Sequence, residues 1–252
     1  MLPRLHLFEF EDQEWFPAFL REGMMDNLTF FFQLTGAYNN AIPLLQKALK
    51  ESRTSRIIDL CSGAGGPLLL LQSAVGVKIT LTDKFPPRAT TPYPAITYLN
   101  QPVDAMNVPR EIQGLRTIFT ALHHFHKKEV LKIFKDATEK NAPVAVFEGS
   151  GRSWLMAILI FPLVFLLSFF CTPFIKPFKI KRIIFTYLIP LIPFFTAWDG
   201  FVSFLRLYSY EEMLEMAVKA DSGYHWEAGE KRSFLFFRMQ YLIGWKTAEA
   251  QG

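Results

Sequence analysis

The sequence predicts an α/β fold built round a doubly wound parallel sheet, and two segments carry that prediction. The first, residues 56–67 (RIIDLCSGAGGP), is an apolar strand that ends at Asp59 and opens into a glycine-rich turn. The second, residues 77–83 (VKITLTD), alternates apolar and polar residues and ends at Asp83, 24 positions after Asp59. This spacing fits one strand–helix–strand unit, which places both acids at the carboxyl edge of the sheet, where such folds bind ligands.

The glycine-rich turn predicts a ligand site. Gly63 and Gly65 let the backbone approach a ligand where a side chain would collide. A dinucleotide fingerprint G-x-G-x-x-G that starts at Gly63 would need its third glycine where Leu68 stands. The turn therefore disfavours a dinucleotide, and an apolar helix is expected to begin at residues 68–71.

Later segments continue the alternation of strands and helices. A third strand is expected to end near Tyr98, a fourth strand and its following turn cover residues 117–125, and a fifth strand covers residues 144–148. Residues 234–237 and 239–245 read as closing strands at an antiparallel end of the sheet. Ahead of the first strand, two or three amphipathic helices are expected, with Pro43 near the start of one.

Taken in order, these segments resemble the class I S-adenosylmethionine-dependent methyltransferase family. The turn is similar to the family's acid-x-G-x-G-x-G pattern at Asp59, Gly63 and Gly65, whereas Cys61 stands where the first glycine is usual. The resemblance covers residues 55–150 well and the tail from Leu205 more weakly. It implies a Rossmann-like sheet, S-adenosylmethionine as cofactor and methyl transfer as the reaction.

The resemblance also implies which residues hold the cofactor. It assigns Asp59 and the glycines to the methionine part, Asp83 to the ribose, and Asp104 with Ala105 to the adenine. The predicted cofactor-binding residues are Asp59, Cys61, Gly63, Gly65, Asp83, Lys84, Asp104, Ala105 and Thr120. Each of these could instead serve as a strand-end cap or a turn residue.

Three side chains are candidates for catalysis. His123 or His124, in the turn after the fourth strand, could act as a general base on an acceptor hydroxyl because histidine titrates near neutrality. Glu148 ends the fifth strand and is the third candidate. A purely structural role is the alternative for each. Adjacent histidines in an extended segment point to opposite faces and no cysteine or carboxylate completes a set, so no metal site is predicted.

At 252 residues, the chain predicts one catalytic domain with added parts rather than two independent domains. The predicted parts are an N-terminal helical cap (1–54), a cofactor-binding core (55–150), a hydrophobic insertion (151–200) and a C-terminal completion of the core (201–252). The two cysteines, Cys61 and Cys171, offer no disulfide framework, which favours a reducing compartment. The acidic N-terminus does not read as a secretory signal.

The insertion predicts contact with a membrane. Residues 153–175 form 23 consecutive positions without a charge, and residues 183–198 form a second uncharged run. Residues 152–198 contain five basic residues and no acid; since the whole chain carries +4, the remainder carries −1. Positive charge confined to an apolar segment favours an anionic membrane surface and disfavours nucleic acid.

The two runs could cross the bilayer or lie in one side of it. As helices they would measure about 34 Å and about 24 Å, against a hydrocarbon core of roughly 30 Å. Pro162, Pro190 and Pro193 are expected to bend them. A hairpin that crosses twice with its basic connector in the cytoplasm would export the cofactor domain. A monotopic or re-entrant hairpin, with the catalytic domain facing the cytoplasm, is therefore preferred; a spanning hairpin, a homodimer interface and a buried helix pair are the alternatives.

The sequence as a whole predicts a membrane-associated methyltransferase acting on a hydrophobic small molecule or lipid, with a hydroxyl oxygen as the preferred acceptor atom. The alternative is a non-catalytic membrane adaptor or assembly factor that retains the fold. Cys61 and the absence of a compelling base keep that alternative open. Cofactor turnover separates the two, whereas cofactor binding alone does not.

Overall fold

The computed structural model describes residues 3–63, 65–86, 93–149, 154–233 and 237–247. Its contacts divide the chain into two units, which are described separately. The sheet unit comprises Ala37–Ser150 and Tyr208–Gly252, and the helical unit comprises Met1–Gly36 and Gly151–Leu207. Residues 37–54 therefore group with the sheet, and residues 201–207 group with the helical insertion.

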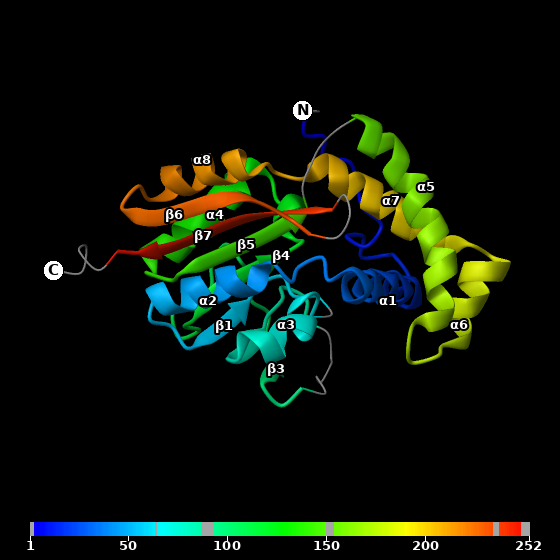
Figure 1. The fold of residues 1–252 in the computed structure, drawn as a ribbon, viewed down its shortest axis with the longest axis horizontal. Coiled ribbons are helices and arrows are strands. Elements are labelled where there is room, and N and C mark those ends of the chain that lie inside the picture. Colours follow the sequence, from blue (N-terminus) through cyan, green and yellow to red (C-terminus); the bar gives the residue numbers. More distant parts are fainter. Residues whose placement is uncertain (1–2, 64, 87–92, 150–153, 234–236, 248–252) are drawn as a thin grey trace. The chain divides into compact units, whose positions relative to one another are not determined.

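The sheet unit is built on a seven-stranded sheet with the order β3-β2-β1-β4-β5-β7-β6 (Figure 1). Neighbours among the first five strands are parallel, and β7 lies antiparallel between β5 and β6. The strands are β1 (Arg56–Asp59), β2 (Lys78–Leu81), β3 (Ile96–Tyr98), β4 (Leu115–Phe119), β5 (Val144–Gly149), β6 (Tyr224–Arg232) and β7 (Arg238–Lys246). The strand order reverses beside β1, so the crevice at the carboxyl ends of β1 and β4 is the expected ligand position.

Helices cover both faces of this sheet, as predicted for a doubly wound fold. On one face lie α2 (Ala41–Glu51) and α3 (Leu68–Val75), and on the other lie α4 (Lys127–Glu139) and α8 (Tyr210–Ala220) (Figure 1). The predicted helix after the glycine turn is thus confirmed as α3, and Pro43 stands in the first turn of α2.

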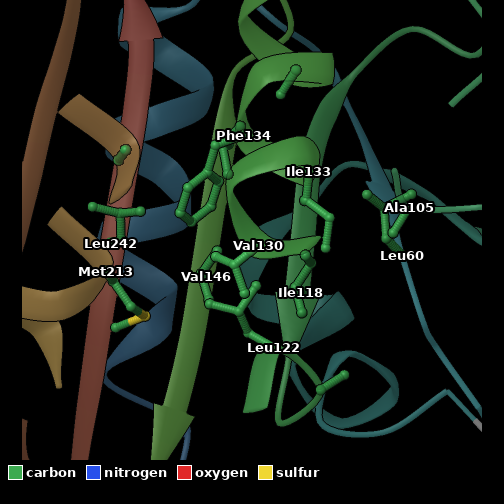
Figure 2. Close-up of a cluster of buried hydrophobic side chains, with 14 of the residues drawn as sticks. Leu60, Ala105, Ile118, Leu122, Val130, Ile133, Phe134, Val146, Met213 and Leu242 are labelled. Atoms are coloured by element: carbon green, nitrogen blue, oxygen red, sulfur yellow. The ribbon is translucent and has the colours of Figure 1, made fainter. Parts of the chain in front are cut away.

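The main core lies between the sheet and the α4–α8 face. Figure 2 shows Ile118 of β4 and Val146 of β5 beside Val130 and Phe134 of α4, all nearly inaccessible to solvent. Leu242 of β7 and Met213 of α8 extend the same cluster. Because parallel strands are buried on both faces, they read in the sequence as short apolar runs.

The closing strands differ in part from the prediction. The strand expected at residues 239–245 is confirmed as β7, but its partner β6 lies earlier, at Tyr224–Arg232. Residues 234–236 lie outside the described residues, and Phe237 belongs to the connection, where its carbonyl accepts from the Ser233 N–H (2.9 Å). The sequence did not predict β6 because this edge strand carries mostly polar, half-exposed side chains.

The helical unit contains three main helices: α1 (Ala18–Thr35), α5 (Trp154–Cys171) and α7 (Leu191–Arg206). Between α5 and α7 the chain forms η2 (Thr172–Phe174), α6 (Ile180–Ile183) and η3 (Ile184–Leu188). α5 packs along α7, and α1 contacts both. The approach of α1 to α7 is close, since a Cβ on Gly23 would lie 2.5 Å from Ile192 Cδ1.

The second apolar run of the insertion is not one helix. The segment Ile180–Leu188 and helix α7 are separate pieces that meet at 79°. Pro190, which precedes α7, cannot donate a backbone hydrogen bond, so the break falls where the prolines predicted a bend. α5, by contrast, continues through Pro162.

Candidate functional site

The turn after β1 is anchored by the buried carboxyl group of Asp59. Its Oδ1 accepts a hydrogen bond from Thr117 Oγ1 of β4 (2.6 Å), and its Oδ2 accepts one from Ser62 Oγ (2.7 Å). Its backbone carbonyl accepts from the Thr82 N–H (2.8 Å) at the end of β2. Asp59 therefore ties three strand ends together from beneath the turn.

Burial controls the charge of Asp59. Removal from water disfavours the ionised form and raises the pKa of Asp59 from 3.8 to about 7, although the Thr117 and Ser62 hydroxyls oppose that rise. The negative charge of Asp83 pushes the pKa in the same direction as burial. Around neutral pH this group holds a proton in a large fraction of molecules.

The Gly63 peptide is fixed from two sides and borders open space. Its N–H donates to Asp83 Oδ2 (2.9 Å), and its carbonyl accepts from the Tyr98 hydroxyl (2.8 Å). With φ at +51°, this backbone conformation favours glycine. A Cβ at this position would meet no atom of the described residues within 4 Å, so this part of the chain leaves room for a ligand.

Gly65 is required for a different reason. Its φ is +101°, and a Cβ there would lie 2.8 Å from the side chain of Leu69 in α3. The glycine therefore permits the turn to pack against the helix that follows it. The sequence motif alone does not show that Gly65 serves packing whereas Gly63 leaves room for a ligand.

Cys61 stands where the motif usually has its first glycine, and its backbone keeps the positive φ that favours glycine. Its φ is +57°, which costs strain for a residue with a Cβ. The side chain is half-buried. Burial, reinforced by Asp83 and Asp59, raises the pKa of the Cys61 thiol far above its usual range, so the thiol stays neutral.

The ends of β2 and β3 present two further acids. Asp83 Oδ1 accepts from the Phe85 N–H (2.8 Å), and the Asp83 carbonyl accepts from the Val103 N–H (2.9 Å). Asp104 Oδ1 accepts from the Met106 N–H (2.9 Å), and its Oδ2 lies 3.3 Å from Lys84 Nζ. The predicted residues Asp83, Lys84 and Asp104 thus adjoin one another, and Ala105 is buried behind them.

A second group of residues lies at the ends of β4 and β5. Glu148 is completely buried, and its Oε1 accepts from the backbone N–H groups of Leu122 (2.7 Å) and His123 (3.2 Å). Its Oε2 lies 2.8 Å from His123 Nδ1. Glu148 therefore fixes both the backbone and the imidazole of His123.

The other two predicted residues of this region flank His123. The His124 ring lies 4.4 Å from the His123 ring, measured between centroids, with a tilt of 31°. Thr120 has φ of +49° and donates its N–H to the Phe147 carbonyl (2.9 Å). Thr120 therefore shapes the sharp exit from β4 that carries the two histidines.

Sequence reasoning missed Ser62, Thr117 and Tyr98, although each hydrogen-bonds to a predicted residue. Ser62 carries a weak local signal, since a serine three residues after an aspartate commonly bonds back to it. Thr117 and Tyr98 carry no such signal, because only the register of β1 with its neighbours brings them to the turn. Ala64, within the predicted motif, lies outside the described residues.

No family model matches the chain, and no curated protein matches its sequence. Solved structures do match. Human N-acetylserotonin methyltransferase in complex with S-adenosylmethionine aligns over 97% of this chain and 64% of its own, with 13% identity and a TM-score of 0.52. An O-methyltransferase family protein from Burkholderia thailandensis aligns over 94% and 58%, with 12% identity and a TM-score of 0.45.

A third match is an O-methyltransferase from neocarzinostatin biosynthesis, solved with S-adenosylmethionine and 2-hydroxy-5-methyl naphthoic acid. It aligns over 88% of this chain and 57% of its own, with 14% identity and a TM-score of 0.46. The chain spans less than two thirds of each of these proteins. At such identities the likeness is one of fold: the chain has the class I S-adenosylmethionine-dependent methyltransferase fold, as the sequence predicted.

Proposed function

We propose that this chain transfers a methyl group from S-adenosylmethionine to a hydroxyl oxygen of a hydrophobic small molecule or lipid at a membrane surface. The observation that carries the proposal is the Gly63 peptide. It is held between Asp83 and Tyr98 and faces open space at the carboxyl edge of a methyltransferase-type sheet. An adaptor that merely retained the fold would not need this turn to stay open.

The residues of the turn fit the cofactor. Each carboxylate oxygen of Asp83 accepts one backbone N–H and keeps a second lone pair, which suits it to receive the ribose hydroxyls. Asp104 and Ala105 adjoin Asp83 through Lys84, where the adenine is expected. Asp59 lies beneath the turn and would act by holding Ser62 and Thr117 in place.

The bound sulfonium would supply an activated methyl group, so that the acceptor oxygen forms its bond to carbon as the carbon–sulfur bond breaks. The protein must then hold the acceptor in line, exclude water and receive the hydroxyl proton. We assign the last task to His123. Because Glu148 holds Nδ1, the basic lone pair of a neutral His123 would lie on Nε2.

The membrane part of the proposal is supported by the insertion. Among the described residues, one segment is long and apolar enough to cross a bilayer: Leu155–Phe174, with 20 residues and a mean hydropathy of 2.6. Only 22% of its most apolar window is buried, whereas a soluble core helix of similar composition is mostly buried. An orientation toward the cytoplasm is proposed because S-adenosylmethionine is a cytosolic metabolite.

Calorimetric titration with S-adenosylmethionine tests the cofactor site. We expect saturable binding by the wild-type protein and at least a roughly tenfold loss in Asp83→Ala, because charge-assisted hydrogen bonds to the ribose are removed. Asp221→Ala is the matched control: Asp221 also accepts an N–H two residues ahead, from Gly223 (2.7 Å), but it precedes β6 at the opposite edge of the sheet. Absence of binding by well-folded wild-type protein would contradict the assignment.

Transfer of labelled methyl from the cofactor into a membrane lipid extract tests the reaction. We expect His123→Gln to lower the rate roughly a hundredfold or more while cofactor affinity stays unchanged, because a base contributes to turnover and not to this binding. An unchanged rate would make His123 a structural turn residue, and binding without transfer to any extract would favour the adaptor.

A further inference from the structure

We propose that the helical unit enters a single leaflet of an anionic phospholipid bilayer and does not cross it. The inference rests on the proposed membrane association and deepens it by fixing its geometry. The inserted surface consists of six apolar side chains from α5, the connector and η3, exposed by 54–77%: Ile158, Leu166, Phe170, Phe174, Phe178 and Leu188. We call these six residues the apolar surface.

The sheet determines how many times the chain can cross. Strand β5 precedes the insertion, and β7 follows it after two intervening elements, α8 and β6. The two strands are paired neighbours, with Glu148 opposite Gln240 and Gly149 opposite Met239. The chain must therefore return to the side that it left, and the number of crossings is zero or two.

Two crossings would need a second span, and among the described residues the other candidate is a bent pair of segments that is either a broken span or a re-entrant loop. After α5 the chain forms the segment Ile180–Leu188 and then α7, and these two pieces are bent by 79°. α7 alone has 16 residues, about 24 Å of helix against roughly 30 Å of hydrocarbon. Its length and the bend both favour a re-entrant path over a returning span.

The polar contacts of α7 argue independently against α7 as a membrane-spanning helix. The buried carboxyl group of Asp199 accepts from the backbone N–H groups of Phe10 (2.8 Å) and Glu11 (3.0 Å). Arg206, also buried, donates to Asp12 (3.0 Å). These bonds hold an acidic N-terminal segment along α7, and a lipid environment would dehydrate its charges at high cost. The remaining possibility is that the chain enters the membrane without crossing it.

Charges beside the apolar surface indicate its partner. Two connector cations are held by acids of α1: Lys179 lies 2.8 Å from Glu22 and 2.9 Å from Asp26, and Arg182 lies 2.5 Å from Asp26. Both of these connector cations are therefore engaged within the protein.

The remaining connector cations suit lipid headgroups. Lys176 and Lys181 are exposed, and Phe174 and Phe178, two positions either side of Lys176, belong to the apolar surface. No acid occurs in residues 152–198 themselves; Lys181 lies over the Phe19 ring, near Glu22 and Asp26 of α1, whereas Lys176 lies outside that group. Two lysines beside exposed aromatic rings complement anionic headgroups above hydrocarbon, whereas a second copy would oppose the same positive charges.

Co-sedimentation with phosphatidylcholine vesicles containing about one third phosphatidylglycerol tests the surface, with the protein otherwise intact. We expect wild-type protein to bind and both Leu166→Glu and Phe174→Glu to lose most binding. Val218→Glu, at an exposed apolar position of α8, is the matched control and should bind like wild type. Replacing both Lys176 and Lys181 by Gln should weaken binding by roughly fivefold per lysine, and only when phosphatidylglycerol is present.

Labelling of Lys176→Cys with a membrane-impermeant maleimide distinguishes insertion from crossing. Wild-type protein gives the background from Cys61 and Cys171. When protein is added to sealed vesicles, a single-leaflet insertion leaves the new thiol reactive from outside. Protection that detergent abolishes would show that the connector has crossed, which would overturn the proposal.

Two further outcomes would overturn it. The first is that wild-type protein does not bind vesicles but forms dimers, and that Leu166→Glu dissociates these dimers. The apolar surface would then bind a second copy of the chain. If the surface variants and Val218→Glu bound vesicles equally well, the membrane contact would lie elsewhere. Neither assay requires S-adenosylmethionine or turnover, so its failure is distinguishable from failure of the proposed reaction.

Discussion

Asp59 illustrates how one residue can look like a ligand in the sequence and serve as a support in the fold. Its position at the end of β1 is the ligand position of doubly wound sheets, yet the two oxygens accept from Thr117 and Ser62. Burial then raises its pKa to about 7. The residue thereby makes the stability of the fold depend on pH below about pH 7.

The sign of that dependence follows from proton binding. Between about pH 4 and pH 7 the unfolded chain has released the Asp59 proton while the folded protein still holds it, so stability falls as pH rises. The group accounts for up to roughly 4 kcal/mol across this window. Asp59→Asn, which cannot ionise, should flatten the stability curve over the same range.

Urea unfolding of Asp59→Asn and wild-type protein at several pH values measures this effect. Asp221→Asn is the control, since Asp221 is less buried and binds an N–H of its own turn. Curves for Asp59→Asn and wild type that stay parallel from pH 4 to about pH 7 would show that Asp59 ionises normally in the folded protein.

At the scale of elements, the turn between β1 and α3 is built by its neighbours as much as by its own glycines. Strand β3 supplies Tyr98, whose hydroxyl holds the Gly63 carbonyl, and the end of β2 supplies Asp83, which holds the N–H. Gly65 lets the turn pack on α3. The proposed cofactor site therefore depends on the register of the sheet, and a substitution in β3 should change the conformation of the turn.

Tyr98→Phe tests that connection. Removing the hydroxyl frees the Gly63 peptide and should weaken S-adenosylmethionine binding by about fivefold, because a net hydrogen bond is worth about 1 kcal/mol. The measurement is the calorimetric titration. Tyr224→Phe is the control: Tyr224 is buried in β6, and its hydroxyl makes no hydrogen bond to any described residue. Equal affinities in wild type and Tyr98→Phe would contradict the predicted role.

At the scale of the whole molecule, one chain builds two units from alternating segments. The sheet unit is interrupted after β5 and resumes at Tyr208, and the interruption joins the N-terminal 36 residues to form the helical unit. Because β7 pairs with β5, the sheet constrains the topology of any membrane contact made by the interruption. Fold and membrane geometry are thus coupled through strand order rather than through any local motif.

The sequence by itself determined the fold class, the strand–turn–helix at residues 56–75 and the apolar character of the insertion. These features depend on local patterns: apolar periodicity, glycines in a turn and long uncharged runs. The positions of β1 to β5 and β7 followed from the same patterns. The edge strand β6 did not, because its polar side chains lack the signal of a buried strand.

Only the tertiary structure decided how the candidate residues are used. Asp59, Gly63 and His123 form hydrogen bonds with residues of other strands or strand ends, 20 to 58 positions away in the sequence. Local sequence patterns do not predict bonds over such separations. Pairing of β5 with β7 likewise decided that the insertion returns to its starting side. Local propensity acts over a few residues, whereas contacts across a sheet are set by register and burial of the whole unit.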